Sequence, residues 1–382
     1  MKILYFTRDY TTHDWRFLAK LAESPHETHF LRLEDDGVPY ERRPLPAGVR
    51  SVAWRGGIAP ARTIADWLGL MPDLERVLDE VCPDLVHAGP IQSCGFLTAL
   101  SGFRPLLLMS WGSDLLVDAD RDEAHRWITR YALRHSDFLL CDCDAVREKA
   151  QAFVPYADER VIQFPWGVDL ARFAPAEDPA AARRRLGLEG EFLVLSTRLW
   201  EDLYDVETVL DAVRIARARN RGVRLILLGD GSLAPRVRRF IADHDLAGSV
   251  TMPGLVPHAA VPDYFRAADL YLSCARSDGS SISLLEAMAT ALPVVVTDTP
   301  ANREWVAPGE GGALVPVGDA AGFARALLNI AALDPAARRR VSQRNREVAA
   351  AHADWDANVA RLLDTYMQIH NGYAADRGLI AR

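Results

Sequence analysis

The sequence predicts an α/β protein made of two doubly wound domains, each a parallel sheet covered by helices. Short apolar runs alternate with helical patterns along the whole chain, which is the pattern of βαβ units. This series occurs twice, and 382 residues are too many for one compact core. A segment rich in alanine, proline and arginine (169–190) separates the two series, so we expect it to be the linker.

Each half is expected to contain six strands, read from its apolar runs. In the first half the runs lie at residues 2–6, 28–33, 85–87, 106–110, 138–141 and 161–164. In the second half they lie at residues 192–197, 223–228, 250–252, 270–273, 294–297 and 313–315. Helical patterns fall between them, for example at 13–22 and 124–134, and a short helix is expected at 179–185 inside the linker.

Three helical patterns close the chain, at residues 319–333, 335–352 and 354–370. They follow the last expected strand of the second half without a further apolar run. We therefore expect the chain to end in helices rather than in another βαβ unit.

Composition excludes several classes of function. Nearly half of the residues are apolar and a quarter are charged, which is typical of a globular protein. The formal net charge of −8 argues against nucleic-acid binding. The five cysteines are scattered, so neither disulfides nor a zinc site are expected. Met1 leads directly into the first strand with neither a secretory signal nor a long apolar run, and we expect a cytoplasmic protein.

The most informative segment is 273–298, SCARSDGSSISLLEAMATALPVVVTD. Two acids, Asp278 and Glu286, flank a loop of small and hydroxyl residues that leads into a helix of strong helix formers. The first backbone N–H groups of a helix have no partner within the helix, so such a loop suits an anion. Glu286, one turn further on, suits a neutral diol such as a ribose.

This segment resembles the signature of the family 4 glycosyltransferases, in which two acids separated by seven residues span a sugar-nucleotide donor. Asp278 stands where the family usually has glutamate. The resemblance extends to 166–173, WGVDLARF, which is similar to the hinge motif of the family. It implies retaining enzymes of the GT-B fold, with two Rossmann-like domains facing across a cleft. The domains are then 1–168 on the acceptor side, 169–352 on the donor side, and 353–382 as a helix that crosses back to the first domain.

The resemblance implies a donor site in the second domain. Arg198 follows the strand at 192–197 and matches the arginine that contacts the donor diphosphate, while the lysine expected nearby is replaced by Tyr204. Glu286 would hold the ribose, Asp278 the transferred sugar, and the helix start the leaving diphosphate. We assign the catalytic roles to Arg198, Asp278 and Glu286, and the remaining donor contacts to Tyr204, Gly229, Gly231, Gly254, Val256, Ser280, Ser281, Ile282 and Ser283. By itself, the Gly229–Gly231 turn is equally well explained as a tight turn.

The candidates on the acceptor side lie at the end of a strand of the first domain or in the segment that follows one. They are Arg8, Asp9, His13, His87, Trp111 and Asp114. Trp111 stands where the family commonly has histidine, and a tryptophan can pack on a sugar face. The alternatives are ordinary ones: a surface position for His13, a core position for His87 and a helix cap for Asp114.

Lysine distribution excludes a related chemistry. No lysine follows Lys149, so the second domain cannot hold pyridoxal phosphate as a Schiff base. This excludes a phosphorylase, which shares the GT-B architecture. The third glycine of the dinucleotide fingerprint is missing after Gly231, which disfavours a nicotinamide enzyme. We expect no cofactor and no essential metal, only a nucleoside diphosphate sugar as co-substrate.

The sequence therefore predicts a hexosyltransferase-type glycosyltransferase that moves a sugar from a nucleoside diphosphate sugar to a hydroxyl of a glycan, a glycolipid or a small natural product. Two alternatives stay open, a nucleotide-sugar 2-epimerase and a catalytically silent sugar-nucleotide-binding subunit. Five arginines and exposed apolar residues between Arg42 and Met71 suit peripheral contact with an anionic membrane or an anionic acceptor. Ordinary loop and core positions explain that stretch nearly as well.

Overall fold

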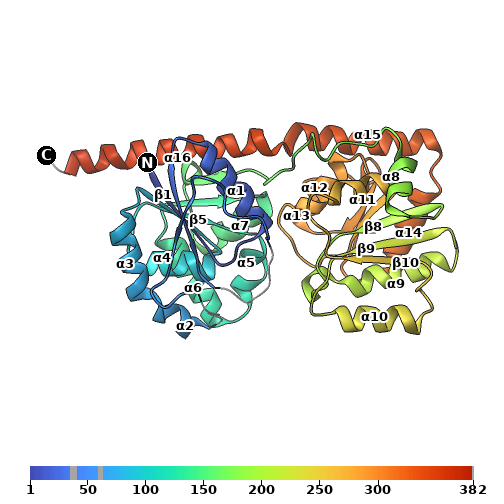
Figure 1. The fold of residues 1–382 in the computed structure, drawn as a ribbon, viewed down its shortest axis with the longest axis horizontal. Helices are drawn as coiled ribbons and strands as arrows, with labels where there is room; N and C mark the ends of the chain where they lie inside the picture. The colour runs from blue at the N-terminus through green and yellow to red at the C-terminus, as the bar shows by residue number, and fades with distance from the viewer. Residues whose placement is uncertain (35–40, 59–62, 381–382) are drawn as a thin grey trace. The chain divides into compact units, whose positions relative to one another are not determined.

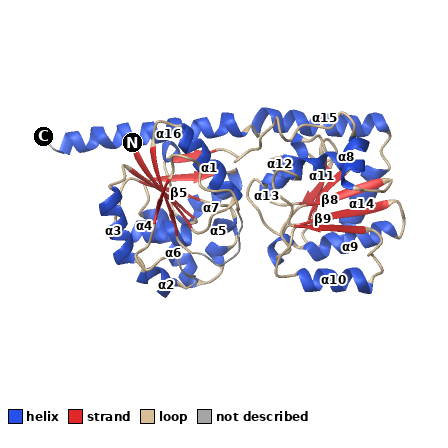
Figure 2. Ribbon diagram, viewed as in Figure 1, coloured by secondary structure: helices blue, strands red, loops and turns tan. Residues whose placement is uncertain are grey.

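The computed structural model describes residues 1–34, 41–58 and 63–380, with side chains described up to residue 372. It divides into two units (Figure 1). Unit 1 contains Met1–Phe164 together with Ala357–Arg382, and unit 2 contains Pro165–Asp356. Each unit is a parallel sheet with helices on both faces, the architecture that the alternating apolar runs predict (Figure 2).

The sheet of unit 1 has seven strands in the order β3-β2-β1-β4-β5-β6-β7. Their bounds are β1 Lys2–Thr7, β2 Glu27–Arg32, β3 Arg50–Val52, β4 Leu85–Gly89, β5 Leu106–Met109, β6 Phe138–Cys141 and β7 Val161–Gln163. All neighbouring strands pair in parallel. The inner strands are almost wholly buried, which explains why they appear in the sequence as continuous apolar runs rather than as an alternation.

The helices of unit 1 connect these strands, and two of the connections also contain a short 3₁₀ turn, at Asp118–Asp120 and Asp158–Arg160. The helices are α1 Thr12–Glu23, α2 Ile64–Gly69, α3 Met71–Val81, α4 Phe96–Leu100, α5 Ser113–Leu116, α6 Glu123–Arg134 and α7 Asp144–Phe153. A π-helical turn, Ile91–Gly95, precedes α4 and is buried along its whole length.

The strand β3 is absent from the sequence prediction. It has three residues, two of them exposed, and pairs at the sheet edge with β2. Its first residue, Arg50, forms an ion pair with Glu27 at 2.5 Å across that edge. Because an exposed edge strand needs no apolar run, periodicity gives no signal for it.

The sheet of unit 2 has six parallel strands in the order β10-β9-β8-β11-β12-β13. Their bounds are β8 Phe192–Ser196, β9 Val223–Leu228, β10 Val250–Gly254, β11 Leu270–Ser273, β12 Val294–Thr297 and β13 Gly312–Val315. The chain runs outward from β8 to β10 and then returns to β11 on the other side of β8. This reversal is the point at which doubly wound sheets bind ligands.

Strand residues of unit 2 feed two separate cores, one on each face of the sheet. Val194 joins the core under α9 and α14, whereas its neighbours Leu193 and Leu195 join the core under α11 and α12. Figure 2 shows these helices on opposite faces. The helices of unit 2 are α8 Pro179–Leu186, α9 Val206–Arg217, α10 Ala234–Asp243, α11 Val261–Ala267, α12 Ile282–Ala289, α13 Pro300–Arg303, α14 Ala320–Ala331 and α15 Pro335–His352, with a 3₁₀ turn at Asp202–Tyr204.

Gly167 shows why the hinge motif contains glycine. Its φ is +67°, and a Cβ there would lie 2.7 Å from the carbonyl oxygen of Ala353. The next amide, that of Val168, donates to the same oxygen at 2.7 Å, and Trp355 donates back to Val168 at 3.1 Å. The start of unit 2 is therefore held against the end of α15, with no room for a side chain.

The last helix, α16, spans Trp355–Ile380, and from Ala357 onward it belongs to unit 1. Val359, Leu362, Tyr366 and Ile369 are buried and fall on one face of the helix. This confirms the expected return of the C-terminal helix to the first domain. Among the helices of the described residues, none is both long and apolar enough to cross a membrane.

Candidate active site

The predicted donor residues of unit 2 collect where β8 and β11 end side by side. Arg198 follows β8, while Asp278 and the start of α12 follow β11. Because parallel strands present their carboxyl ends at one edge, residues about 80 positions apart in the sequence meet there. Their contacts determine what this edge can bind.

Arg198 is the centre of this arrangement. Its guanidinium forms an ion pair with Asp278 at 2.8 Å and donates hydrogen bonds to Ser281 at 3.0 Å and Ser283 at 3.1 Å. The ring of Tyr204 covers it, with 4.1 Å between the guanidinium carbon and the ring centroid. Four side chains thus hold the planar fork in one orientation, which is the geometry that suits a diphosphate.

The surroundings keep Arg198 charged. Burial lowers its pKa, but the carboxylate of Asp278 and the oxygens of Tyr204 and Tyr271 raise it by more, so that the pKa lies well above the usual value for arginine. Tyr271, from β11, donates to Ser283 at 2.8 Å and so fixes one of the two hydroxyls that Arg198 contacts. A cation held in a partly dry setting interacts more strongly with an anion than one in water does.

The start of α12 lies beside Arg198. Ser281 is its N-cap residue, yet the Ser281 side chain forms no capping hydrogen bond. The hydroxyl instead accepts from Arg198 and lies 3.3 Å from the hydroxyl of Ser283. An N-cap serine normally satisfies one of the first N–H groups of its helix. Here the Ser281 hydroxyl accepts from Arg198 instead. The N-terminal end of α12, which carries a partial positive charge, therefore lies next to the guanidinium.

Glycines bring backbone close to Arg198. Gly229 has φ +105°, and a Cβ there would lie 2.7 Å from the carbonyl oxygen of Arg198. A Cβ on Gly231 would lie 2.5 Å from the carbonyl oxygen of Trp200. The β9 turn therefore packs directly on the loop after β8 and requires both glycines. Gly254, at φ +78°, accepts a hydrogen bond from the amide of Gly229 at 3.0 Å, which ties the end of β10 to this turn.

Glu286 lies one turn into α12 and is almost fully buried. Its carboxylate is 3.7 Å from Nε2 of His258, a residue of the loop between β10 and α11. Of the residues near that loop, only Gly254 and Val256 were predicted as donor contacts from the sequence, and His258 was not. The rule that sites follow strand ends could have found it, because His258 comes four residues after β10 and is titratable.

The other predicted donor residues lie in the same region. Ser280 is buried and accepts from the indole of Trp305 at 3.3 Å, so the loop before α12 is braced from the segment after α13. Ile282 is the first residue of α12 and packs, like Val256, against the core that lies under α11 and α12. The described contacts therefore place every predicted donor residue at one edge of unit 2.

In unit 1, the corresponding edge carries the acceptor-side candidates. Arg8 and Asp9 follow β1, and each is near a charged partner from the neighbouring strand β2 or the residues after it. Arg8 pairs with Glu34, and Asp9 is 3.8 Å from Arg32. His13 lies in the first turn of α1, and its ring is 6.0 Å from the ring of Trp111.

Trp111 follows β5 and also meets Phe17 edge to face at 6.1 Å. The three rings of His13, Phe17 and Trp111 therefore join α1 to the loop after β5. Trp111 and His13 are both half-buried, so part of each ring surface remains open. This is the aromatic surface of the edge on which a sugar face could pack.

Asp114 and His87 are buried. Asp114 accepts from the hydroxyl of Ser110 at 2.6 Å and from the amides of Ile91 and Leu115 at 3.1 and 3.0 Å. Burial raises its pKa to about 6, although these hydrogen bonds lower it. Asp114 is not the helix cap of the alternative interpretation, since it lies inside α5 and joins the loops after β4 and β5.

His87 is fully buried, and its Nδ1 is hydrogen-bonded to the hydroxyl of Tyr366 in α16. Its ring meets Tyr5 edge to face at 5.0 Å. Burial lowers the pKa of His87 to about 3, so the imidazole is neutral. These contacts correspond to the core position that the sequence analysis left open as an alternative.

Most described residues of the stretch between Arg42 and Met71 are exposed or half-buried. Trp54 and Trp67 are buried, and Arg43 and Arg55 have acidic neighbours in Glu41 and Asp73. Arg62 lies outside the described residues. The exposed apolar side chains that remain are those of Ile58 and Leu68.

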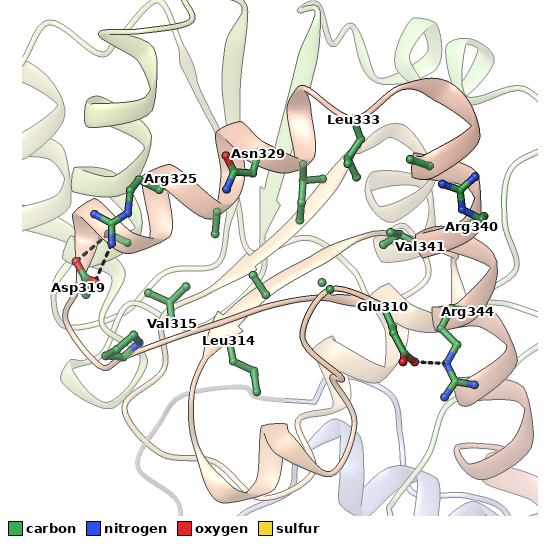
Figure 3. Close-up of a pocket in the computed structure, with 18 residues that line it drawn as sticks. Glu310, Leu314, Val315, Asp319, Arg325, Asn329, Leu333, Arg340, Val341 and Arg344 are labelled. Atoms are coloured by element: carbon green, nitrogen blue, oxygen red, sulfur yellow. Dashed lines mark hydrogen bonds and ion pairs between the residues drawn. The ribbon is translucent and has the colours of Figure 1, made fainter.

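A cavity of about 890 Å³ lies elsewhere in unit 2, between β13, α14 and α15 (Figure 3). Its rim carries two ion pairs, Asp319 with Arg325 at 3.6 Å and Glu310 with Arg344 at 3.5 Å. None of the predicted donor residues lines it. Within the described part of the chain, no cluster of histidine, cysteine and acidic side chains has the arrangement of a metal site.

Comparison with known proteins identifies families for both halves of the chain. Residues 2–143 match the family model described as glycosyl transferase 4-like, and residues 191–332 match the one described as glycosyl transferases group 1. A D-inositol 3-phosphate glycosyltransferase of Kineococcus radiotolerans is 31% identical over 266 residues, which are 64% of this chain and 60% of that protein. The matched segments span 40% to 64% of the length of the first curated relatives.

Solved structures agree on the fold. A sucrose-phosphate synthase from Thermosynechococcus elongatus superposes with a TM-score of 0.82 at 20% identity, over 97% of this chain and all of that one. Anabaena Alr3699/HepE, solved in complex with UDP and glucose, gives a TM-score of 0.79 at 18% identity, over 96% of this chain and all of that one. Both are similar to this chain across both units.

Proposed function

Because the chain belongs to the family 4 glycosyltransferases, with the GT-B fold, we propose that it transfers a hexose from a nucleoside diphosphate sugar to a hydroxyl acceptor. The observation that carries this proposal is the arrangement around Arg198, where one cation, two serine hydroxyls and the start of α12 converge. The inositol phosphate glycosyltransferase of Kineococcus and the UDP complex of HepE support a sugar-nucleotide donor. They do not favour the epimerase or the silent subunit.

The physical task of such an enzyme is to stabilise a departing diphosphate while the sugar becomes oxocarbenium-like. In our proposal, Arg198 and the amides at the start of α12 bind the diphosphate oxygens. Each well-placed donor of this kind contributes about 3–4 kcal/mol to transition-state stabilisation. Glu286 accepts from the ribose, Asp278 contacts the transferred sugar, and the backbone of Gly254 and Val256 borders the base.

We propose that transfer retains the anomeric configuration and needs no divalent cation. The acceptor oxygen would bond to the anomeric carbon on the face from which the diphosphate leaves, and the acceptor proton would pass to a phosphate oxygen. The ion pair between Asp278 and Arg198 supports this mechanism, because it leaves Asp278 engaged and the mechanism needs no separate general base. The product stereochemistry, read by NMR, and full activity in excess EDTA are the matching tests.

The acceptor side of the proposal rests on unit 1. The half-buried rings of His13 and Trp111 offer an apolar surface for an acceptor, with Arg8 and Asp9 beside β1. We also propose a cytoplasmic enzyme that contacts an anionic membrane peripherally through Ile58, Leu68 and their neighbouring arginines. Co-sedimentation with phosphatidylglycerol vesicles tests this contact, with neutral vesicles as the control.

One experiment tests the activity directly. The protein is screened against UDP-, GDP-, ADP- and TDP-sugars by thermal shift and by release of free sugar. One donor that raises the melting temperature and is slowly hydrolysed supports the proposal. A rise in melting temperature without sugar release, with every acceptor tried, supports instead a silent binding subunit. No response to any donor contradicts the proposal.

A further inference from the structure

Two hydrogen bonds fix His258 in unit 2. Arg172, in the segment between β7 and α8, donates from Nη1 to His258 Nδ1 at 2.9 Å. Its Nη2 donates to the main-chain oxygen of the same histidine. Arg172 is itself held, because Arg266 donates to the Arg172 carbonyl oxygen and the ring of Phe173 lies 5.8 Å from the guanidinium carbon. Arg172 therefore holds His258 at one ring nitrogen and at its main-chain oxygen.

The hydrogen bond from Arg172 determines which ring nitrogen of His258 carries the proton. A guanidinium only donates hydrogen bonds, so Nδ1 must accept. In a neutral imidazole that accepts at Nδ1, the proton is on Nε2. The Nε2–H group is the one that faces Glu286, since Nε2 is 3.7 Å from the carboxylate oxygen. Arg172 thus turns His258 into a donor on the side of Glu286.

The gap between the two groups has the chemistry of a hydroxyl site. A separation of 3.7 Å is too long for a direct hydrogen bond. A hydroxyl that lies against both groups can donate to the carboxylate of Glu286 and accept from Nε2–H of His258 at once. The carboxylate has a second oxygen for a neighbouring hydroxyl. A vicinal diol matches this pair of groups, whereas a single hydrogen-bond donor or acceptor matches only half of it.

With Glu286 at the ribose as in the proposed function, we propose that His258 is a second residue that binds the ribose diol, and that Arg172 is the positioning residue that orients His258. This inference rests on the proposed function and adds a specificity residue to it: His258 distinguishes a ribonucleoside diphosphate from a deoxyribonucleoside one. A site built to hydrogen-bond a hydroxyl rejects an analogue that lacks it, because the protein groups are then left unpaired.

The test measures nucleotide binding alone by calorimetry, with UDP and GDP and with their 2′-deoxy and 3′-deoxy forms. We expect His258→Ala to weaken binding of the better ribonucleotide about five- to tenfold, the loss of one hydrogen bond. One of the two deoxy nucleotides lacks the hydroxyl that His258 contacts. His258→Ala and the wild type should bind that nucleotide with equal affinity. His258→Gln keeps an N–H group near the position of Nε2 and should recover part of the loss.

Arg172 is tested through its coupling to His258. Arg172→Ala should weaken the ribonucleotide by a similar factor, and the double variant Arg172→Ala, His258→Ala should bind no worse than either single variant. Arg183→Ala is the matched control. Arg183 ties α8 to Ala267 and Asp269 at 2.8 and 2.7 Å, and none of these hydrogen bonds involves His258. It should lower the melting temperature but keep the dependence on the diol.

Two results overturn the inference. One is an unchanged affinity of His258→Ala for both ribonucleotides. The other is an equal loss for the ribonucleotide and for both deoxy forms, which would mean that His258 does not contact the diol. The outcome is separate from that of the proposed function, because the ligands carry no transferable sugar on the diphosphate. Diol-dependent binding without transfer would leave the inference standing while the proposed activity fails.

Discussion

The carboxyl edges of the two sheets have similar topology but opposite chemistry. At the edge of unit 2, Arg198 and the start of α12 present a cation and a helix N-terminus, and the N-cap serine is turned toward the cation. At the edge of unit 1, the buried carboxylates are occupied by the chain itself. Asp114 joins three loop groups, and Asp14 accepts from Thr11 and Tyr5.

The difference teaches that strand order locates a site without deciding what it binds. Burial raises the pKa of Asp14 and of Asp114 to about 6. Both carboxylates accept hydrogen bonds that hold neighbouring segments of unit 1 together. In unit 2, the central charged group is the guanidinium of Arg198, and the residues around it raise its pKa. In the proposed function the edge of unit 2 binds a diphosphate, whereas the buried carboxylates of unit 1 hold the loops of that unit together.

The largest expected effect comes from removing the cation of unit 2. Arg198→Ala should lower the transfer rate at least about 100-fold, because it deletes a donor to the departing diphosphate. Steady-state kinetics with the donor found by the screen measures it. Arg276→Ala is the matched control, since Arg276 pairs with Asp205 at 3.0 Å at the same edge. Equal losses in both variants would contradict the special role of Arg198.

The buried acid of unit 1 should appear in stability rather than in donor binding. Asp114 has a pKa of about 6 in the fold, against about 3.9 in an unfolded chain. A raised carboxyl pKa stabilises the fold fully below the unfolded value, and this contribution is lost as the pH rises through about 6. The free energy of unfolding of the wild type minus that of Asp114→Asn should therefore fall by about 2 kcal/mol between pH 4 and pH 7.

Urea unfolding of both proteins at pH 4, 5.5 and 7 measures that difference. Nucleotide affinity of Asp114→Asn, measured at pH 7, should equal that of the wild type. A stability difference that grows with pH would contradict the assignment of a raised pKa. A loss of nucleotide binding would contradict the contrast between the two edges.

The glycine turn of unit 2 gives a smaller effect. Gly229→Ala should lower the free energy of unfolding by about 1–3 kcal/mol, because φ is +105° and the new Cβ would meet the backbone of Arg198. Gly248→Ala, where nothing lies within 4 Å of the new atom, should stay within about 0.5 kcal/mol of the wild type. Chemical denaturation compares the pair, and equal effects would show that the close approach carries no strain.

The smallest effect should come from neutralising the acid beside Arg198. Asp278→Asn keeps the shape but removes a negative charge that competes with the diphosphate for the guanidinium. We expect nucleoside diphosphates to bind up to about tenfold more tightly, equal to about 1.4 kcal/mol, while transfer slows. Calorimetry and kinetics on the same preparation separate the two. Weaker binding would mean that Asp278 positions Arg198 rather than competing for it.

Much of this fold could be predicted from the sequence, because every inner strand is buried on both faces and therefore appears as an apolar run. The exposed strand β3 could not, since it has no such run. The sequence predicted that Arg198 and Asp278 lie in one site, because the family resemblance places both at the donor and because each follows the end of an expected strand. The diversion of Ser281 from its helix to Arg198 could not be predicted, because an N-cap serine looks the same in sequence whichever partner it chooses.

Buried partners explain the remaining gaps. His87 ends the strand expected at 85–87 and so resembles a site residue, but β4 continues to Gly89 and the partner of His87, Tyr366, lies 279 positions away in the last helix. His258 is the converse case, a loop residue whose role depends on Arg172, 86 positions earlier. Sequence patterns describe one element at a time, and both histidines are defined by a second element that the pattern of their own strand or loop does not contain.

The contact between His87 and Tyr366 also bears on how the molecule is made. Unit 1 is built from residues on both sides of unit 2 in the sequence, so β1 to β7 are synthesised before unit 2 and the α16 residues that contact His87 are synthesised after it. On the ribosome, all of unit 2 must emerge before unit 1 can be completed. Until then the region around His87 lacks the helix that covers it, and we expect the nascent protein to be most prone to aggregation while unit 2 is being synthesised.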